Sequence, residues 1–197
     1  MIFKWFTGLL IRRFQARYDY DMGYAQELLD SSRMAFMHYA LMGMPAAYRK
    51  DVPKDAWYAA KMVAARQEDC GPCLQLVMNM AELDGVPAAT RRAVWARDER
   101  AMNDDVRLAW RYAEAAMAHA PDLAEWCEAI RQRWGQRGLA CLALSMTASR
   151  SFPMLKYALG HGQQCRAVRI DGQVLSGVDA PAAELVELAE WPHHGRP

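Results

Sequence analysis

The sequence predicts an all-α fold that ends in a small β-hairpin, and three observations support this fold class. Apolar residues recur at helical spacing through most of residues 2–165. Prolines and glycines divide this pattern into segments of ordinary helix length. An alternating pattern typical of strands occurs only near the end of the chain. With 53% hydrophobic and 24% charged residues, the 197-residue chain can build one sizeable core.

Residues 1–20 are predicted to form an N-terminal segment, with an amphipathic helix over residues 2–17. The apolar side chains near one stripe of this helix are Ile2, Phe3, Phe6, Leu10 and Phe14. We favour a helix that packs on the domain or on a partner subunit, and keep contact with a membrane surface as the alternative. Its apolar run is too short to span a bilayer, and arginines follow it in place of a cleavage site. We therefore expect a cytoplasmic protein without a signal peptide.

Residues 21–165 are predicted to form the main helical domain. The expected helices cover residues 23–43, 54–67, about 72–83, about 88–97, 104–119, 121–134 and 139–148, and the last resumes at 154–159. Pro53 suits a first helical turn, Asn103 can cap the helix that follows it, and Gly135 suits a helix end. Pro45 is expected to end the helix over 23–43, and Pro153 to kink or break the last one.

Residues 166–197 are predicted to form a β-hairpin followed by a weakly ordered tail. Apolar residues alternate in 167–170 and 173–175, on either side of Asp171 and Gly172. An Asp-Gly pair is strongly preferred in a two-residue type I′ turn. We expect weak order from Ala180 onward, and a solvated end at the final histidine pair.

The charge balance and the cysteines narrow the range of functions. A formal net charge of +1 gives no support to nucleic-acid binding. An odd count of five cysteines without a signal peptide does not fit a secreted disulfide framework. Cys127, Cys141 and Cys165 are isolated, whereas Cys70 and Cys73 form a Cys-x-x-Cys pair. Zinc binding is an alternative use of such a pair, but the sequence has no second paired ligand motif, so no metal is expected.

The spacing of Cys70 and Cys73 indicates thiol–disulfide redox chemistry. Residues three apart in a helix lie on nearly one face, so their sulfurs can form a small disulfide ring. The pair coincides with a predicted helix start, marked by Pro72, where unpaired N–H groups and the helix dipole favour thiolate over thiol. We therefore expect a reactive thiol with a resolving partner beside it.

Cys-Gly-Pro-Cys is also the thioredoxin tetrapeptide, but a thioredoxin fold requires strands on both sides of the motif. Here a helical pattern rich in alanine and methionine precedes it. Three segments carry a resemblance to a known family, residues 57–65, 68–76 and 85–87. In them the chain resembles the alkylhydroperoxidase D-like (AhpD-like) branch of the carboxymuconolactone decarboxylase superfamily. The resemblance covers roughly residues 50–165.

The resemblance implies a compact helical bundle that forms homo-oligomers and reduces peroxides through the cysteine pair. It implies no metal or organic cofactor in that step. It also implies that Cys73 attacks the peroxide and that Cys70 resolves the product. The helix-terminus argument alone makes Cys70 the more acidic thiol, so the order of attack stays open.

The sequence departs from the family in its proton relay. The best-known members carry Glu twelve residues before the first cysteine and His four residues after the second, where this chain has Tyr58 and Val77. A peroxidatic thiol needs a base to ionise it and an acid for the departing hydroxide. The candidates to replace the relay are Glu68, Asp69, Tyr58, Lys61 and His161. An alternative to which we give equal weight is that Glu68 and Asp69 have no role in proton transfer. They would then be acidic residues that the dipole of the next helix favours at its start.

Taken together, the residues predict a thiol-dependent peroxidase or disulfide reductase that cycles Cys70 and Cys73 between dithiol and disulfide. Its partners would be a peroxide or disulfide substrate, an external thiol reductant and further copies of the chain. The alternative is a redox-sensing or interaction subunit that keeps the fold without peroxidase turnover. Decarboxylation ranks last, because that chemistry does not require a Cys-x-x-Cys pair.

Overall fold

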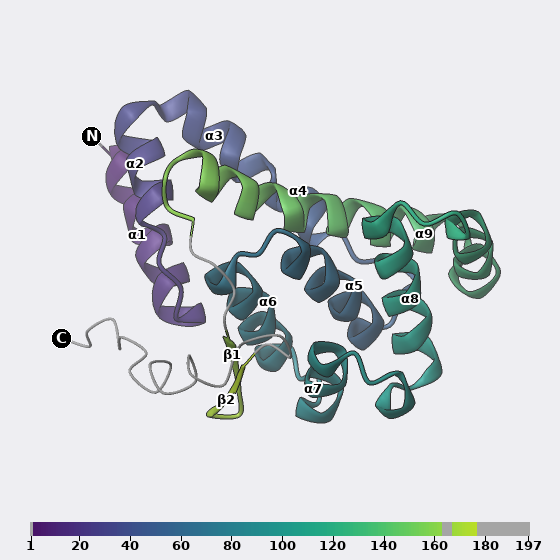
Figure 1. The fold of residues 1–197 in the computed structure, drawn as a ribbon. Helices are drawn as coiled ribbons and strands as arrows, with labels where there is room; N and C mark the ends of the chain where they lie inside the picture. The colour runs from purple at the N-terminus through teal and green to yellow at the C-terminus, as the bar shows by residue number, and fades with distance from the viewer. Residues whose placement is uncertain (1, 163–166, 177–197) are drawn as a thin grey trace.

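The fold is mostly helical and ends in one antiparallel hairpin (Figure 1), as the computed structural model of residues 2–162 and 167–176 shows. This confirms the predicted all-α fold with a small C-terminal hairpin. The expected weak order from residue 180 onward lies outside the described residues. Within those residues, no helix combines the length and apolarity that a membrane span requires.

The elements follow the chain in one order. They are α1 (Ile2–Tyr18), α2 (Gly23–Ser31), α3 (Arg33–Leu41), α4 (Gly43–Ala47), α5 (Lys54–Gln67), α6 (Gly71–Leu83), α7 (Ala88–Ala96), a short 3₁₀ turn (Glu99–Ala101), α8 (Asp104–Ala118), α9 (Leu123–Ala158), β1 (Ala167–Ile170) and β2 (Gln173–Ser176). Their starts agree with the signals in the sequence. Asn103 Oδ1 accepts a hydrogen bond from the Val106 amide at 2.9 Å and caps α8.

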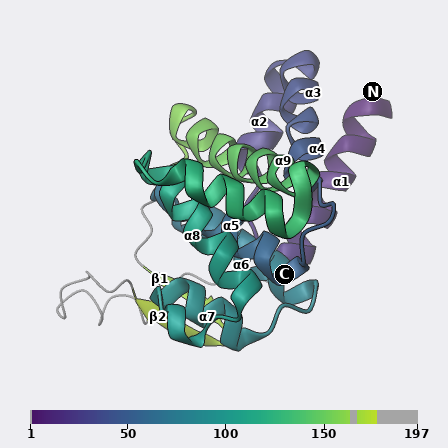
Figure 2. The ribbon, with the colours of Figure 1, turned by 90° about the vertical axis from the view of Figure 1, so that its right-hand side faces the viewer.

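Helix α5 forms the centre of the molecule and packs against α6, α7, α8 and α9. Every residue from Ala56 to Ala65 is buried, so α5 has no continuous solvent face. Five of those ten residues are alanines, whose small side chains let neighbouring helices approach closely. Figures 1 and 2 show α8 and α9 lying beside α5, with α6 on another side.

The helix predicted over residues 23–43 is wrong in its extent, because the chain forms two shorter helices there, α2 and α3, and a third, α4, begins at Gly43. Ser32 has extended backbone angles, and its hydroxyl accepts from the Ala35 amide at 3.2 Å, so it ends α2 and caps α3. Pro45 does not end a helix but lies inside α4. It is the third residue of α4, where the backbone N–H has no intrahelical partner to lose.

Two interruptions were predicted in the long C-terminal helical region, and only one breaks the helix. Gly135 has φ 70° and ψ 177° and separates two helical stretches within α9, as predicted. Pro153 leaves the helix continuous to Ala158, with no non-helical backbone angles at that point. Pro153 is buried, so tertiary packing holds the helix together although the proline ring removes one backbone hydrogen bond.

Helices α1, α2 and α3 form a second layer with its own small core. The buried apolar side chains of this cluster are Ile11, Tyr20, Met22, Tyr24, Ala25, Leu29 and Phe36. Helix α1 packs on α2 and α6 through the face that carries Thr7 and Ile11. Phe6 and Leu10, expected near the apolar stripe, are exposed instead.

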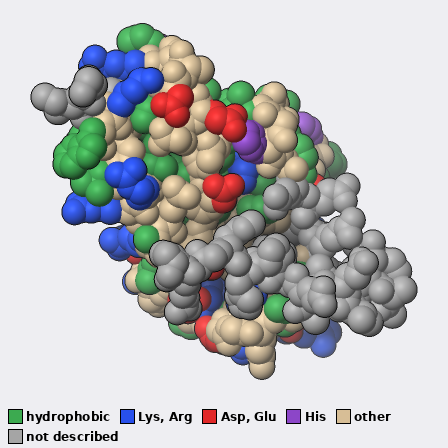
Figure 3. Space-filling view, turned by 90° about the vertical axis from the view of Figure 1, so that its left-hand side faces the viewer, with side chains coloured by type: hydrophobic (Ala, Val, Ile, Leu, Met, Phe, Trp, Pro, Cys, Tyr) green, Lys and Arg blue, Asp and Glu red, His purple; other side chains and the backbone are tan. Residues whose placement is uncertain are grey.

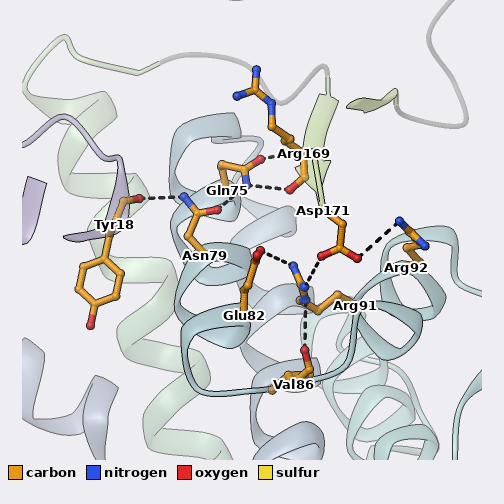
Figure 4. Close-up of polar contacts among 9 residues, drawn as sticks. All are labelled: Tyr18, Gln75, Asn79, Glu82, Val86, Arg91, Arg92, Arg169 and Asp171. Carbon is orange, nitrogen blue, oxygen red and sulfur yellow. Dashed lines mark hydrogen bonds and ion pairs between the residues drawn. The ribbon is translucent and has the colours of Figure 1, made fainter. Parts of the chain in front are cut away.

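A polar seam on α6 joins three parts of the chain (Figure 4). The Gln75 side-chain amide donates to the carbonyl of Arg169 at 2.9 Å and accepts from the Arg169 amide at 2.6 Å, so it pairs with β1 as a strand would. Gln75 also donates to Asn79 Oδ1 at 2.7 Å. Asn79 donates to the carbonyl of Tyr18 at 2.8 Å, which ties the end of α1 to α6.

A buried arginine fixes the hairpin turn to α6 and α7. Arg91 donates to Glu82 at 2.8 Å, to Asp171 at 2.9 Å and to the carbonyl of Val86 at 3.3 Å (Figure 4). Asp171 and Gly172 have φ of 50° and 75°, the positive values that a type I′ turn requires at both central residues. The hairpin is thus docked on the domain by charge as well as by its buried residues.

Candidate active site

Cys70 and Cys73 lie at the start of α6 and are joined by a disulfide, with their Cα atoms 5.3 Å apart. Cys70 is the residue that precedes the first helical position, and its carbonyl accepts the Leu74 amide at 3.0 Å. Cys73 belongs to the first helical turn. The start of α6 at Gly71 rather than Pro72 therefore keeps both sulfurs at the helix terminus, where the sequence placed them.

This position favours an anionic sulfur when the pair is reduced. The first-turn amides of Gly71 and Cys73 have no partner within α6, and Pro72 has no amide hydrogen. Unpaired amides and the positive end of the helix dipole both stabilise a thiolate relative to a thiol. The local backbone thus supplies part of the activation that a redox thiol needs.

Both cysteines are buried, with exposed fractions of 0% for Cys70 and 4% for Cys73. In this conformation a substrate or reductant does not reach the sulfurs from solvent. Access requires movement of a covering element, and the segment between α1 and α2 is one, because Tyr20 from that segment contacts Cys73.

Tyr20 is the polar side chain at the disulfide. Its hydroxyl lies 3.6 Å from Cys73 Sγ, within hydrogen-bond range for sulfur. Burial raises the pKa of Tyr20 well above its ordinary value, so the phenol keeps its proton at neutral pH. A protonated phenol at this distance can donate to a Cys73 thiolate once the disulfide is reduced.

Lys156 places a buried cation next to the same tyrosine. Its Nζ atom lies 4.9 Å from the ring centroid of Tyr20 and 5.4 Å from that of Tyr24. Burial lowers the pKa of Lys156, and the nearby Asp21 carboxylate partly opposes this shift. Since Lys156 is on the last turns of α9, the end of that helix contributes to the surroundings of the cysteine pair.

The loop before Cys70 is held by the same part of α9. Arg150 forms an ion pair with Glu68. The Tyr157 hydroxyl donates to the carbonyl of Asp69 at 2.8 Å. Asp69 has φ 48°, a left-handed conformation that Asp adopts more readily than most non-glycine residues. Glu68 and Asp69 therefore fix the entry into α6, besides lying next to Cys70 in sequence.

The remaining relay candidates are engaged with other groups. Tyr58 donates to Asp84 at 2.6 Å, and burial raises the pKa of its phenol. Lys61 donates to the carbonyl of Ala46 at 3.0 Å. His161 lies 3.0 Å from a carboxylate oxygen of Glu27 on α2.

Residue 77, where the AhpD-like resemblance would lead one to expect a histidine, does not supply a relay either. Val77 is buried in the core and carries no polar atom in its side chain. Among the candidates from the sequence, the structure thus brings Glu68 and Asp69 to the cysteine pair, and shows the three others bonded to groups elsewhere.

Tyr20 and Lys156 were not among the predicted site residues. Tyr20 is 53 positions from Cys73 in the chain, so no local spacing connects them. Lys156 lies beyond Pro153, where the prediction placed a kink or break in the helix. A local signal for Tyr20 is the run of tyrosines at positions 18, 20 and 24, but such a run fits an ordinary core equally well.

No group of three or more His, Cys, Asp or Glu side chains among the described residues is arranged to hold a metal ion. A surface hollow lined by Arg107, Arg111 and Trp126 contains none of the residues around the cysteines.

Comparison of the chain with protein-family models, with curated proteins and with solved structures finds no match.

Proposed function

We propose that the protein is a thiol-dependent oxidoreductase, a peroxidase or disulfide reductase, that cycles Cys70 and Cys73 between dithiol and disulfide. The observation that carries the proposal is the disulfide at the first turn of α6 with the Tyr20 hydroxyl on Cys73. A structural disulfide needs no hydrogen-bond donor at its sulfur, whereas a thiolate intermediate does. The resemblance to AhpD-like proteins agrees with this chemistry and remains part of the proposal.

The reaction begins with the reduced pair. The Cys73 thiolate attacks the terminal oxygen of a hydroperoxide, the O–O bond breaks, and an alkoxide or hydroxide leaves and takes up a proton. The resulting sulfenic acid condenses with the Cys70 thiol, which releases water and forms the disulfide. An external dithiol then reduces the pair by two exchange steps and is itself oxidised.

We assign the attack to Cys73 because Tyr20 contacts that sulfur. The phenol donates to the thiolate, and Lys156 adds a positive charge behind the tyrosine ring. Together they replace the stabilisation of charge that a Glu and His relay would give. Cys70, which precedes the helix, acts as the resolving thiol.

A second function has its own supporting observation, the burial of both cysteines. A sensor or interaction subunit needs a disulfide that changes its structure, and does not need rapid access for substrate. In this alternative, slow oxidation of the pair changes how the α1–α3 layer packs on α6. The absence of a Glu or His at positions 58 and 77 also favours it.

Peroxide titration separates the two functions. The reduced protein is mixed with an organic hydroperoxide in stoichiometric amount, and free thiols are counted over time. The peroxidase loses two thiols per chain much faster than free cysteine is oxidised. Cys70→Ser should accumulate a sulfenic acid at Cys73, Cys73→Ser should not react, and Cys127→Ser is the matched control with unchanged kinetics.

Oxidation no faster than that of free cysteine would exclude the peroxidase. Repeated reduction of oxidised glutathione in the presence of an external dithiol would then support the disulfide reductase, whereas a disulfide that forms once per chain without turnover would support the sensor. In that case the oxidised and reduced proteins should differ in the hydrogen exchange of α1–α3.

A further inference from the structure

The outer face of α1 carries large apolar side chains that no part of the described fold covers. Trp5, Phe6 and Leu10 have exposed fractions of 66%, 53% and 47%. They lie away from Thr7 and Ile11, which face the domain. Two exposed aromatic residues on neighbouring positions are unusual for a surface that meets only water.

The same face becomes cationic toward the end of the helix. Arg12, Arg13 and Arg17 are exposed and follow the apolar residues, and α1 contains no acidic residue. Lys4 is not counted with them, because it pairs with Asp30 on α2 at 3.6 Å. Figure 3 shows basic side chains beside hydrophobic ones over α1, at the left edge of the view.

We propose that this face of α1 binds the surface of an anionic lipid bilayer. Helices that lie in the interface carry Trp, Phe and Leu for the acyl boundary and Lys or Arg for the phosphates. Here the two groups follow one another along the axis, about 18 Å from Trp5 to Arg17 at 1.5 Å per residue. The helix would therefore lie tilted, with its first turns deeper than its last.

A bilayer fits this face better than a second copy of the chain. In a two-fold contact the same patch meets itself. With parallel helices the arginines of one copy meet those of the other, and with antiparallel helices they meet its apolar turns, so neither arrangement of α1 on α1 gives them an anionic partner. Helix α1 has no acidic side chain to compensate them. A surface of lipid phosphates supplies both the apolar layer and the negative charge.

Vesicle flotation tests this binding on the full chain. Vesicles of phosphatidylcholine with phosphatidylglycerol should carry the protein, and vesicles of phosphatidylcholine alone should bind it far less. Raising the salt concentration should weaken binding. Arg12→Gln, Arg13→Gln and Arg17→Gln together should lower the affinity by about two orders of magnitude, at about fivefold per arginine. Trp5→Ser with Phe6→Ser should abolish flotation.

Matched controls use exposed residues elsewhere. Met34→Ser with Leu41→Ser removes apolar surface from α3, and Arg49→Gln, Arg100→Gln and Arg131→Gln removes three distant cations. Both controls should float like the wild type. Equal loss in the controls, or equal binding to neutral vesicles, would overturn the proposal. Self-association in light scattering that disappears in Trp5→Ser with Phe6→Ser would also overturn it, and would assign the face to a second copy.

Discussion

The hydroxyl of Tyr20 lies 3.6 Å from the sulfur of Cys73, although the two residues come from different layers of the molecule. One belongs to the segment that leaves α1, and the other to the first turn of α6. The contact joins the N-terminal layer to the Cys70–Cys73 disulfide. It also gives Cys73 a hydrogen-bond donor, which neither Tyr58 nor Val77 provides.

Tyr20→Phe should slow the reaction of Cys73 about tenfold, because a hydrogen bond to a charged group contributes about 1.5 kcal/mol. The measurement is the rate of alkylation of Cys73 in the Cys70→Ser background as a function of pH. The apparent pKa of the thiol should rise in the variant. Tyr39→Phe is the control, because Tyr39 bonds to the Tyr24 hydroxyl at 2.9 Å and to the Met22 thioether at 3.8 Å, and not to a cysteine sulfur. An unchanged pH profile would show that the contact is only packing.

In the wild type, the free energy of unfolding should rise at alkaline pH because of Lys61. Lys61→Met should remove this part of the rise. Burial lowers the pKa of Lys61 to about 8, whereas an unfolded lysine titrates near 10.5. Between those values the unfolded state binds more protons than the folded state, so the free energy of unfolding rises with pH. The rise should be about 2 kcal/mol larger in the wild type than in the variant, since each pKa unit corresponds to about 1.4 kcal/mol.

Urea titrations from pH 7 to pH 10 measure that difference. Other groups titrate in both proteins and cancel in the comparison. Parallel curves would mean that the ammonium of Lys61 keeps an ordinary pKa through its bond to Ala46 and its contact with the Trp57 ring, 4.1 Å away.

Arg91→Met should destabilise the protein by about 2 kcal/mol, because a buried cation and its three hydrogen bonds are lost. Its partners Glu82 and Asp171 are partly exposed and can be solvated, which limits the cost. Hydrogen exchange of Ala167–Ile170 should increase more than that of α5. Arg131→Met, which breaks the exposed pair with Glu128, should cost less than about 1 kcal/mol.

Gly135→Ala should cost about 1–3 kcal/mol, because φ 70° with ψ 177° is a region that essentially only glycine occupies. An added methyl group would meet nothing within 4 Å, so the cost is conformational and not steric crowding. Gly43→Ala also meets nothing within 4 Å but has no positive φ, and should be neutral or stabilising. Thermal unfolding of both variants measures the contrast, and equal midpoints would contradict it.

The sequence predicted the helices whose ends carry local signals. Asn103 and Gly135 act within a few residues of themselves, and both boundaries are confirmed. Pro45 and Pro153 misled the prediction, because one lies in a first turn and the other is held by burial. Their effect depends on where the helix begins and on what packs against it.

Local sequence signals likewise predict only some of the residues in the candidate site. The position of Cys70 and Cys73 at a helix start follows from residues next to them, and the hairpin turn follows from Asp171 and Gly172. Tyr20 and Lys156 reach the site only through tertiary packing, from segments far away in the chain. Helical periodicity assigns such residues to a core, and does not say what they face there.

Because the disulfide is buried, the rate at which it is reduced does not follow from its reduction potential alone. A reductant can be strong enough to break the bond at equilibrium and still react slowly, because exchange requires in-line attack on a sulfur. With Cys70 fully covered, that attack waits for a local opening of the α1–α2 segment or of α6. The oxidised protein should therefore persist for a time set by the frequency of this local opening. During that time the disulfide would remain as a record of an earlier exposure to oxidant.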